Sequence, residues 1–343
     1  MSEIIGNPII VGGGAGMELV CNVGSGATVT AKLGSKTITG ISADGQCRLK
    51  IPEEGQWEVS AVKGALTSVK QTVAVPATVN IDLVSKTLNL NTWAAIKSVS
   101  DASMGANYWA VGDTKTITIN GTVRSFTFSN LSIDVFIIGF NHNSGKEGSN
   151  KIHFLIGKIN KTLAALCDNG YNNSGDGFRM NTTQTNRGGW KSSHMRTTIL
   201  GNGNSNTPSS PLASSLMAVL PSDLRTVMKE VTKYTDNVGG GQNNASSVTA
   251  TTDYLFLLAE FEVYGSRSGA NSTEQNYQVQ YDYFKAGNSK IAYRHSAMSS
   301  AVWWWLRSPY YNNNSNFQNV NTSGSVSNYT AYYCGGLCAG FAA

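Results

Sequence analysis

Charge is scarce in this chain of 343 residues, and its C-terminal part has none. Only 14% of the residues are Asp, Glu, Lys or Arg, and none of these types occurs from Ser308 to Ala343. Disordered segments usually combine high net charge with low hydrophobicity, whereas this segment mixes Tyr, Phe, Val and Leu with its polar residues. We therefore expect residues 308–343 to be folded.

The chain also lacks the sequence features that lead into or through a membrane. Residues 1–8 have neither the basic stretch nor the apolar run of a secretory signal. No window approaches the roughly twenty apolar residues of a membrane span. The cysteines are odd in number and irregular in spacing, which is typical of free thiols in a reducing cytoplasm. They are Cys21, Cys47, Cys167, Cys334 and Cys338.

Basic clusters are missing as well. The 26 basic residues exceed the 21 acidic ones only slightly and are scattered. The densest basic stretch, residues 179–196, is interrupted by Gly and Asn and has no aromatic ladder, so we expect no nucleic-acid partner. The Gly-rich run at residues 11–16 lacks the Lys-Ser/Thr pair of a phosphate-binding loop. We interpret residues 1–16 as an attachment segment.

A run of short alternating strands follows this segment. Turn signals such as Gly34-Ser35 and Asp44-Gly45 separate the strands. Seven strands at this spacing predict an immunoglobulin-like (Ig-like) β-sandwich over residues 17–84, a spacer to which we assign no chemistry. The strands are expected at Met17–Asn22, Ala27–Leu33, Lys36–Ile41, Gln46–Ile51, Trp57–Val62, Ser68–Val75 and Thr78–Leu83.

After an expected linker at residues 85–91 the pattern changes to mixed helices and strands. Asn91 is expected to cap a helix, and Asn120-Gly121 to join two strands, residues 115–119 and 122–128, in a hairpin. The whole chain is thus predicted to be mostly β, with an α+β domain over residues 92–343. Its further elements are strands at Ser132–Phe140, Lys151–Ile159 and Tyr254–Val263 and helices at Trp190–Leu200 and Pro221–Tyr234.

A tryptophan-rich junction, residues 303–309 (WWWLRSP), precedes a run of Asn and Tyr. Seven of the nineteen residues from Tyr310 to Asn328 are Asn, and most of the others are Tyr, Ser or Thr. Tyr supplies a large, stiff contact area and Asn and Ser supply adaptable hydrogen bonds, a composition typical of a binding surface. The alternative interpretation is an Asn-rich hairpin whose side chains cap their own turns.

This C-terminal pattern resembles the variable proteins of diversity-generating retroelements. The resemblance rests on the WLRSP junction, the Asn/Tyr/Ser run, the Phe317-x-x-Val320 strand and the turn at Gly324. Upstream it includes Gly188-Gly189-Trp190 with Met195-Arg196, Leu220-Pro221 and the run Thr252–Leu258, so that it covers residues 92–343.

In that family a C-type-lectin-like fold, shared with formylglycine-generating enzymes, displays a C-terminal region that adenine-directed mutagenesis rewrites, mostly at Asn codons. The corresponding region here is residues 303–343. Such changes of an Asn codon cannot produce Lys, Glu, Gln, Met or Trp, and Gln318 is the one residue of these types from Tyr310 to Ala343. Gln318 is therefore expected to be a fixed position.

The resemblance implies a receptor-binding protein of a phage tail tip or fibre. Its expected partners are a host cell-surface protein or glycan, other tail proteins through the N-terminus, and two further copies in a homotrimer that raises avidity. The expected location is the virion, reached from the bacterial cytoplasm by lysis, without membrane insertion and without a cofactor.

The resemblance also divides the C-terminal region into display and scaffold positions. The expected ligand contacts are Tyr310, Tyr311, Asn312, Asn313, Asn314, Asn316, Asn319, Asn321, Asn328, Tyr332 and Tyr333. The expected scaffold residues are Trp303, Trp304, Trp305, Arg307, Phe317 and Val320.

Two alternatives from other functional classes stay open. One is an oxidase of the formylglycine-generating type acting through Cys334 or Cys338, although a reactive thiol needs a nearby cation or helix N-terminus and this tail is uncharged. The other is a structural tail or baseplate subunit that does not contact a receptor. We predict no enzyme activity.

Metal binding has little support in the sequence. The four histidines, His142, His153, His194 and His295, have no second ligand at metal-site spacing. A carboxylate site from Asp253, Glu260 and Glu262 would need several loops to converge. We expect no metal.

Arg307 is the last charged residue of the chain and has no acid near it in sequence. If it is buried, it must pair with a distant carboxylate such as Glu260 or Glu262, or with backbone carbonyls. The alternative is an exposed arginine at the mouth of a loop.

Overall fold

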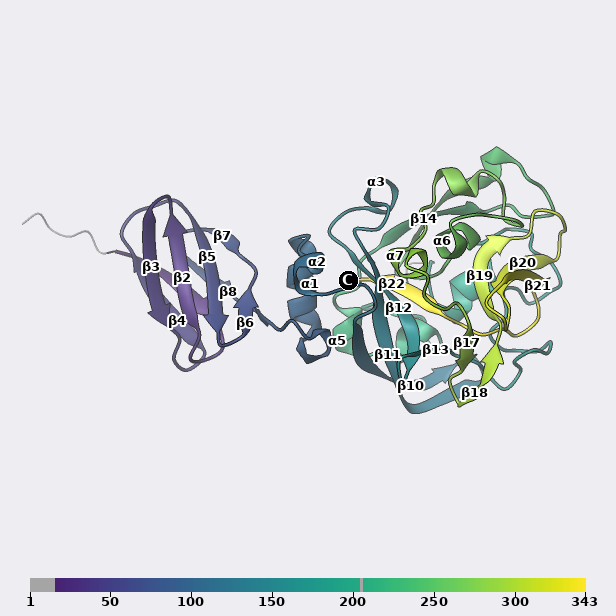
Figure 1. Cartoon of the computed structure of the whole chain (residues 1–343), viewed down its shortest axis with the longest axis horizontal. Helices are drawn as coiled ribbons and strands as arrows, with labels where there is room; N and C mark the ends of the chain where they lie inside the picture. Colours follow the sequence, from purple (N-terminus) through teal and green to yellow (C-terminus); the bar gives the residue numbers. More distant parts are fainter. Residues whose placement is uncertain (1–15, 204–205) are drawn as a thin grey trace, which may run out of the picture. The chain divides into compact units, whose positions relative to one another are not determined.

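The computed structural model describes residues 16–203 and 206–343. About 42% of the chain is strand and 16% is helix, so the prediction of a mostly β protein is confirmed. The chain divides into two compact units, residues 1–86 (unit 1) and 87–343 (unit 2), and the division falls inside the expected linker (Figure 1). Apart from Gly16, the expected attachment segment at residues 1–16 lies outside the described residues.

Unit 1 consists of two sheets that share one core. One sheet has the strand order β4-β1-β8 and the other β3-β2-β5-β6-β9, with β7 also paired to β5. Alternate residues of β1, β2, β4 and β5, among them Leu19, Val29, Leu49 and Trp57, are buried together between the sheets. The strands are β1 Met17–Asn22, β2 Thr28–Leu33, β3 Lys36–Ile41, β4 Gln46–Ile51, β5 Gln56–Lys63, β6 Leu66–Ser68, β7 Gln71–Ala74, β8 Ala77–Asn80 and β9 Leu83–Val84.

Two of the seven strands expected in unit 1 are each broken in two. The expected strand at residues 68–75 becomes β6 and β7, which both pair with β5 but in registers that differ by one residue. Val69-Lys70 absorbs that shift. The expected strand at residues 78–83 becomes β8, on the first sheet, and β9, on the second.

Unit 2 begins with short helices. Its longest helix is α1, Trp93–Asp101, which starts one residue later than expected because Thr92, not Asn91, provides the cap: the Thr92 hydroxyl accepts from Ala95 N at 3.1 Å. In the described part of the chain, no helix has the length and apolar character needed to cross a membrane. The other α-helices are α2 Gly105–Tyr108, α3 Ser144–Glu147, α4 Leu216–Val219, α5 Ser222–Arg225, α6 Glu260–Tyr264 and α7 Asp282–Lys285.

The main sheet of unit 2 has the order β10-β11-β12-β13-β17-β18, and β22 joins it by pairing with both β12 and β16. Its core is apolar and includes the stacked rings of Phe154 and Phe341, which lie on β12 and β22. The strands are β10 Thr114–Val123, β11 Phe126–Phe140, β12 Ile152–Ile159, β13 Thr162–Ala165, β16 Leu255–Leu257, β17 Ala292–Arg294, β18 Ala297–Val302 and β22 Ala339–Ala342.

The expected hairpin turn at Asn120-Gly121 is wrong. β10 continues through these residues with a bulge, and the chain turns instead at Arg124-Ser125, where Arg124 has a φ of 55°. Gly121 has a φ of 125°, and a Cβ there would lie 2.9 Å from a methyl carbon of Val219. The glycine therefore serves a bulge and a close contact rather than a turn.

Three further element predictions in unit 2 are wrong. The helix expected at residues 221–234 ends at Arg225, because Val231–Asp236 (β14) pairs with Val248–Asp253 (β15) as a hairpin. The apolar residues of that stretch fit a helical period, but tertiary strand pairing outweighs local propensity. The helix expected at residues 190–200 is reduced to a π-helical turn at Met195–Ile199. The strand expected at residues 254–263 ends at Leu257 and gives way to α6, which carries Glu260 and Glu262.

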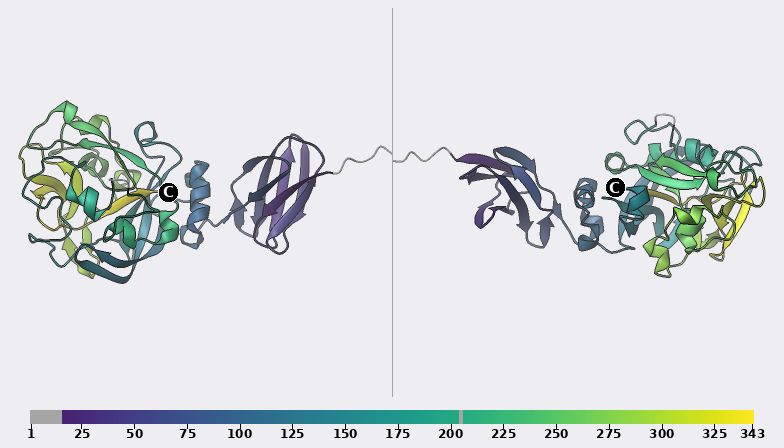
Figure 2. Two further views of the ribbon diagram at one scale, coloured as in Figure 1. Left: turned by 180° about the vertical axis from the view of Figure 1, so that it is seen from behind. Right: turned by 90° about the horizontal axis from the view of Figure 1, so that it is seen from above.

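Residues 304–330 form a separate three-stranded antiparallel sheet, β19-β20-β21. Its strands are β19 Trp304–Pro309, β20 Asn316–Val320 and β21 Val326–Thr330. Figures 1 and 2 both place this sheet at the border of unit 2. The strands of this sheet and the loops between them carry most of the expected display positions.

Candidate functional site

The three tryptophans of the junction anchor the C-terminal sheet in unit 2. Trp304 and Trp305 are fully buried and Trp303 is 7% exposed. Each indole N–H has an acceptor, which a buried tryptophan requires: Trp303 donates to the Asn172 side chain at 3.0 Å, and Trp305 to the Phe178 carbonyl at 3.1 Å. Trp304 donates to a backbone carbonyl at 3.0 Å. Phe317 and Val320 on β20 are also fully buried.

Arg307 is fully buried and forms a two-pronged ion pair with Glu262. Its Nη1 and Nη2 atoms lie 2.5 and 2.8 Å from the two carboxylate oxygens. Nη1 also donates to the Leu257 carbonyl at 2.8 Å, and Nε to the Thr235 hydroxyl at 2.7 Å. The prediction of a buried pairing with a distant carboxylate is confirmed, and the exposed alternative is wrong.

Glu262 belongs to a larger buried cluster that the sequence did not predict. Lys233 donates to Glu262 at 3.1 Å, to Glu147 at 2.7 Å and to the Tyr281 hydroxyl at 2.9 Å. Burial alone would raise the pKa of Glu262, but the charges of Arg307 and Lys233 outweigh it and hold that pKa well below its usual range. Burial raises the pKa of Glu147 to about 7 in spite of Lys233.

His142, Glu147 and Glu262 bring three potential metal ligands within 4.8 Å of one another. The carboxylates, however, already accept from Lys233 and Arg307. A metal ion would add charge to a buried site that holds two cations. Burial, reinforced by Lys233, lowers the pKa of His142 to about 3, so this ring is neutral and stacks on Tyr281 at 3.6 Å. We interpret the cluster as structural.

The loop before β20 is organised by Asn186, a buried residue far away in sequence. Its side-chain amide donates to the carbonyls of Tyr310, Asn313 and Asn316 at 3.2, 2.9 and 2.9 Å. Its backbone N–H donates to the Asn314 carbonyl at 2.8 Å. Four carbonyls of residues 310–316 are thus fixed by one asparagine. Sequence reasoning missed it because no local pattern marks an asparagine in a polar loop.

The expected contact residues fall into three exposure classes. Asn312 and Asn314 are exposed, and Asn319 is 2% exposed. The assignment of Asn319 as a ligand contact is therefore wrong. Asn319 is buried because β20 is the central strand of the sheet β19-β20-β21 and because Asn319 lies opposite Trp305. The half-exposed remainder are Tyr310, Tyr311, Asn313, Asn316, Asn321, Asn328, Tyr332 and Tyr333.

Several asparagine side chains are used within the sheet. The side-chain oxygen of Asn313, Oδ1, accepts from Ser315 N and Asn316 N at 3.0 and 2.8 Å. The side-chain oxygen of Asn321 accepts from Ser323 N at 2.9 Å. These two asparagines cap their own turns, as the alternative interpretation predicts. Asn316 bonds to Asn328 across the strands at 2.6 Å. Asn312 and Asn314 form no side-chain hydrogen bond with any residue that the structure describes.

Three tyrosines near the C-terminus form a chain of ring contacts that begins at Trp303. Trp303 stacks on the half-exposed Tyr329 with ring centroids 5.1 Å apart. Tyr329 contacts Tyr333 at 4.8 Å, and Tyr333 contacts Tyr332 at 5.0 Å. Tyr329 was missed as a site residue, although its position in the Tyr-rich tail could have identified it. We call the partly or fully exposed residues of both groups the display surface: Tyr310, Tyr311, Asn312, Asn314, Tyr329, Tyr332 and Tyr333.

Cys334 and Cys338 are fully buried in unit 2. Burial, with a smaller effect of Asp168, raises the pKa of Cys334 to about 12, and burial raises that of Cys338 well above its usual range. A nucleophilic thiol needs the opposite shift and some access. This environment argues against thiol chemistry at either residue.

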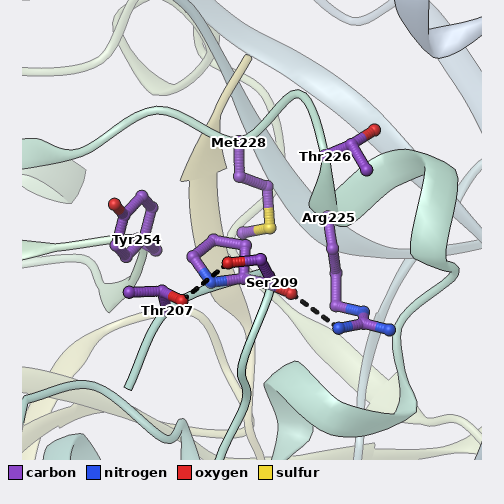
Figure 3. Close-up of a pocket in the computed structure, with 7 residues that line it drawn as sticks. Thr207, Ser209, Arg225, Thr226, Met228 and Tyr254 are labelled. Atoms are coloured by element: carbon purple, nitrogen blue, oxygen red, sulfur yellow. Dashed lines mark hydrogen bonds between the residues drawn. The ribbon is translucent and has the colours of Figure 1, made fainter. Parts of the chain in front are cut away.

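One cavity of about 250 Å³ lies elsewhere in unit 2. Arg225 donates to the Pro208 carbonyl at 2.6 Å. The Thr207 and Ser209 hydroxyls are hydrogen-bonded to each other at 2.9 Å (Figure 3). These polar groups are satisfied within the chain and do not converge on one point, as a ligand site would require. The lining residues are Thr207, Pro208, Ser209, Arg225, Thr226, Met228 and Tyr254.

In a comparison with known protein families, residues 169–337 match the family model described as Domain of unknown function (DUF6273). The matched segment lies within unit 2 and includes Asn186, Arg307 and the whole display surface. No curated protein and no solved structure matches the chain.

Proposed function

We propose that this protein is a receptor-binding protein of a phage tail, in which unit 2 presents the display surface to a ligand on the host cell. The observation that carries the proposal is the contrast between the two layers of the C-terminal region. A buried layer of tryptophans, Phe317 and the Arg307–Glu262 pair lies beneath partly exposed tyrosines and asparagines without charge.

Such a contrast suits a surface whose residues can change while its support stays fixed. The exposed Asn312 and Asn314 side chains make no bond on which the fold depends, whereas the loop backbone is fixed through Asn186. Tyrosine rings that already pack against neighbouring rings, such as Tyr329 and Tyr333, lose little conformational entropy on binding. The side chains of the display surface carry no charge of their own, which favours contacts by stacking and neutral hydrogen bonds, although Arg267 lies over the ring of Tyr311 at 5.9 Å.

We further infer that unit 1 is an Ig-like spacer and that unit 2 has a C-type-lectin-like fold. Two sheets around one core support the first inference. Several small sheets, long loops and short helices around a C-terminal strand paired inside the main sheet support the second. The proposal places the protein in the virion and assigns it no cofactor.

The formylglycine-type oxidase is disfavoured by the buried thiols of Cys334 and Cys338 and their raised pKa values. The structural-subunit alternative receives some support from Asn313 and Asn321, because their side chains cap turns and are not available for a ligand. A binding experiment separates it from receptor binding.

The test is a binding assay of the full-length chain on cells of its host and of unrelated strains. The test variant replaces Tyr310, Tyr311, Asn312 and Asn314 by Ser, which should abolish host binding without lowering the melting temperature. The control replaces Ile41 and Leu90, which are 74% and 75% exposed, by Ser and should bind like the parent. Unchanged binding by the test variant would favour the structural-subunit alternative.

Diversification can be tested separately by sequencing many clonal descendants. The proposal expects changes at Asn-type codons of residues 310–334 and none at Asn186, which supports the loop backbone. Changes spread evenly over unit 2 would contradict targeted diversification.

A further inference from the structure

Two cysteines of unit 1 lie directly opposite each other on neighbouring strands. β1 and β4 pair antiparallel, and in their register Cys21 is the partner of Cys47. Both side chains are buried, at 0% and 2% exposure, and both belong to the core between the two sheets. Their thiols therefore point to the same face of the sheet.

This placement satisfies the backbone requirement for a disulfide. Directly opposed residues of antiparallel strands have Cα atoms about 4.5–5.5 Å apart. A disulfide needs a Cα separation of about 4.4–6.8 Å. Among the strand pairings of the described residues, no other cysteine has a cysteine as its partner. The backbone of Cys334 forms a β-bridge with that of Tyr171. Cys167 and Cys338 each follow one residue of the antiparallel Leu166–Leu337 β-bridge, so they are not directly opposite each other.

We propose that Cys21 and Cys47 are a site of oxidative modification and form a cross-strand disulfide when the protein meets a small-molecule disulfide such as oxidised glutathione. This inference is independent of the proposed function, because it rests only on the register and burial of β1 and β4.

The reaction balances as two successive thiol–disulfide exchanges. One cysteine, as its thiolate, attacks oxidised glutathione and forms a mixed disulfide, releasing one glutathione thiol. The second cysteine attacks the mixed disulfide, and a second glutathione thiol leaves. The protein loses two hydrogen atoms and is oxidised, and one glutathione disulfide is reduced to two thiols.

Access comes from β4, which is an edge strand of its sheet. Cys47 is its second residue, next to the turn at Asp44-Gly45. Strand ends open locally more often than the centre of a sheet. Burial, however, raises the pKa of Cys47 and depletes its thiolate. Thiol–disulfide exchange in the folded chain is for this reason expected to be slow, although local opening permits it. During refolding it should be fast.

The cross-link would close a loop that contains β2 and β3. Because those strands belong to the other sheet, the bond would restrain both sheets of unit 1 in the unfolded chain. Unit 1 should then melt at a temperature higher by about 5 °C or more, while the transition of unit 2 should not move.

The experiment uses the full-length chain, unfolded in urea and refolded in a mixture of oxidised and reduced glutathione, with free thiols then blocked by iodoacetamide. Peptide mapping without reductant should find a cross-linked pair containing Cys21 and Cys47, with Cys167, Cys334 and Cys338 alkylated. Calorimetry should show the shift of unit 1 and its reversal by dithiothreitol. A Cys47→Ala variant is the matched control and should show no reversible shift.

Unfolding in urea exposes every thiol, so a failure of Cys21 and Cys47 to oxidise could not be attributed to their burial. Recovery of Cys21 and Cys47 as alkylated thiols or as separate glutathione adducts would overturn the proposal. So would a cross-link that joins either of them to a cysteine of unit 2.

Discussion

Arg307 satisfies a carboxylate, a carbonyl and a hydroxyl with one planar group. Lysine keeps the charge but has a single ammonium, so Arg307→Lys leaves part of this buried set without a donor. We expect unit 2 to lose about 3 kcal/mol of unfolding free energy, the scale of a broken buried ion pair. Urea unfolding measures this loss. The control Arg187→Lys changes an exposed arginine and should stay within about 0.5 kcal/mol. Equal stability of the two variants would contradict the role of the pairing.

His142 makes the stability of unit 2 depend on pH. The ordinary pKa of histidine is 6.5, and burial lowers that of His142 to about 3. Between these values the unfolded chain takes up a proton that the folded chain excludes, so stability falls as pH decreases from 6.5 to 3. The slope is up to about 1.4 kcal/mol per pH unit.

The variant that tests this effect is His142→Phe, which keeps a ring on Tyr281 but cannot titrate. Measured across that pH window, the unfolding free energy of the parent should fall relative to that of the variant as pH decreases, because only the parent has a proton that the folded state excludes. Glu274 has its pKa raised to about 7 by burial and acts with the opposite sign, but parent and variant share it. Parallel pH profiles would show that His142 makes no such contribution.

At the scale of elements, the loop at residues 310–316 depends on an asparagine that it does not contain. Asn186→Ala removes the donor for the carbonyls of Tyr310, Asn313 and Asn316. We expect a loss of about 1–3 kcal/mol and faster amide hydrogen exchange in this loop. Asn312→Ala, at an exposed position of the same loop, should change neither quantity. Loop exchange that is unchanged in Asn186→Ala would show that the tail holds its own shape.

The elements also show where sequence reasoning succeeds. Alternating residues between Gly and Asp turns place β1 and β4 correctly, because short strands with one buried face carry a local period. The same alternation places β3 correctly, although its inward face is only partly buried. The Pro221–Tyr234 helix fails because β14 obtains its conformation from a partner strand, β15. The pairing of Arg307 with a distant acid such as Glu262 was inferable on the condition that Arg307 is buried, since a buried arginine without a local acid needs a distant one. Asn186, Lys233 and Glu147 were not, because their partners lie far away in sequence and no spacing connects them.

At the scale of the whole molecule, the chain combines two compact units with separate cores, and the display surface belongs to unit 2. Each copy offers a small patch of uncharged residues with Arg267 over the ring of Tyr311, and from its small size we expect a weak interaction with the receptor. Strong attachment to a cell then requires several copies at once, which is the physical reason to expect a homotrimer. Linking copies raises the effective concentration of the second and third contacts without any new contact.

Multivalency gives the last prediction. When the full-length chain is prepared as a monomer and as a fused trimer, the trimer should bind host cells about 10²–10⁴ times more tightly. The trimer that carries Ser at Tyr310, Tyr311, Asn312 and Asn314 is the control and should bind no better than the monomer. Flow cytometry over a concentration series measures both, and sedimentation gives the oligomeric state of the chain without a fusion. Equal affinity of monomer and trimer would mean that one display surface suffices, and the trimer would then have no role in attachment.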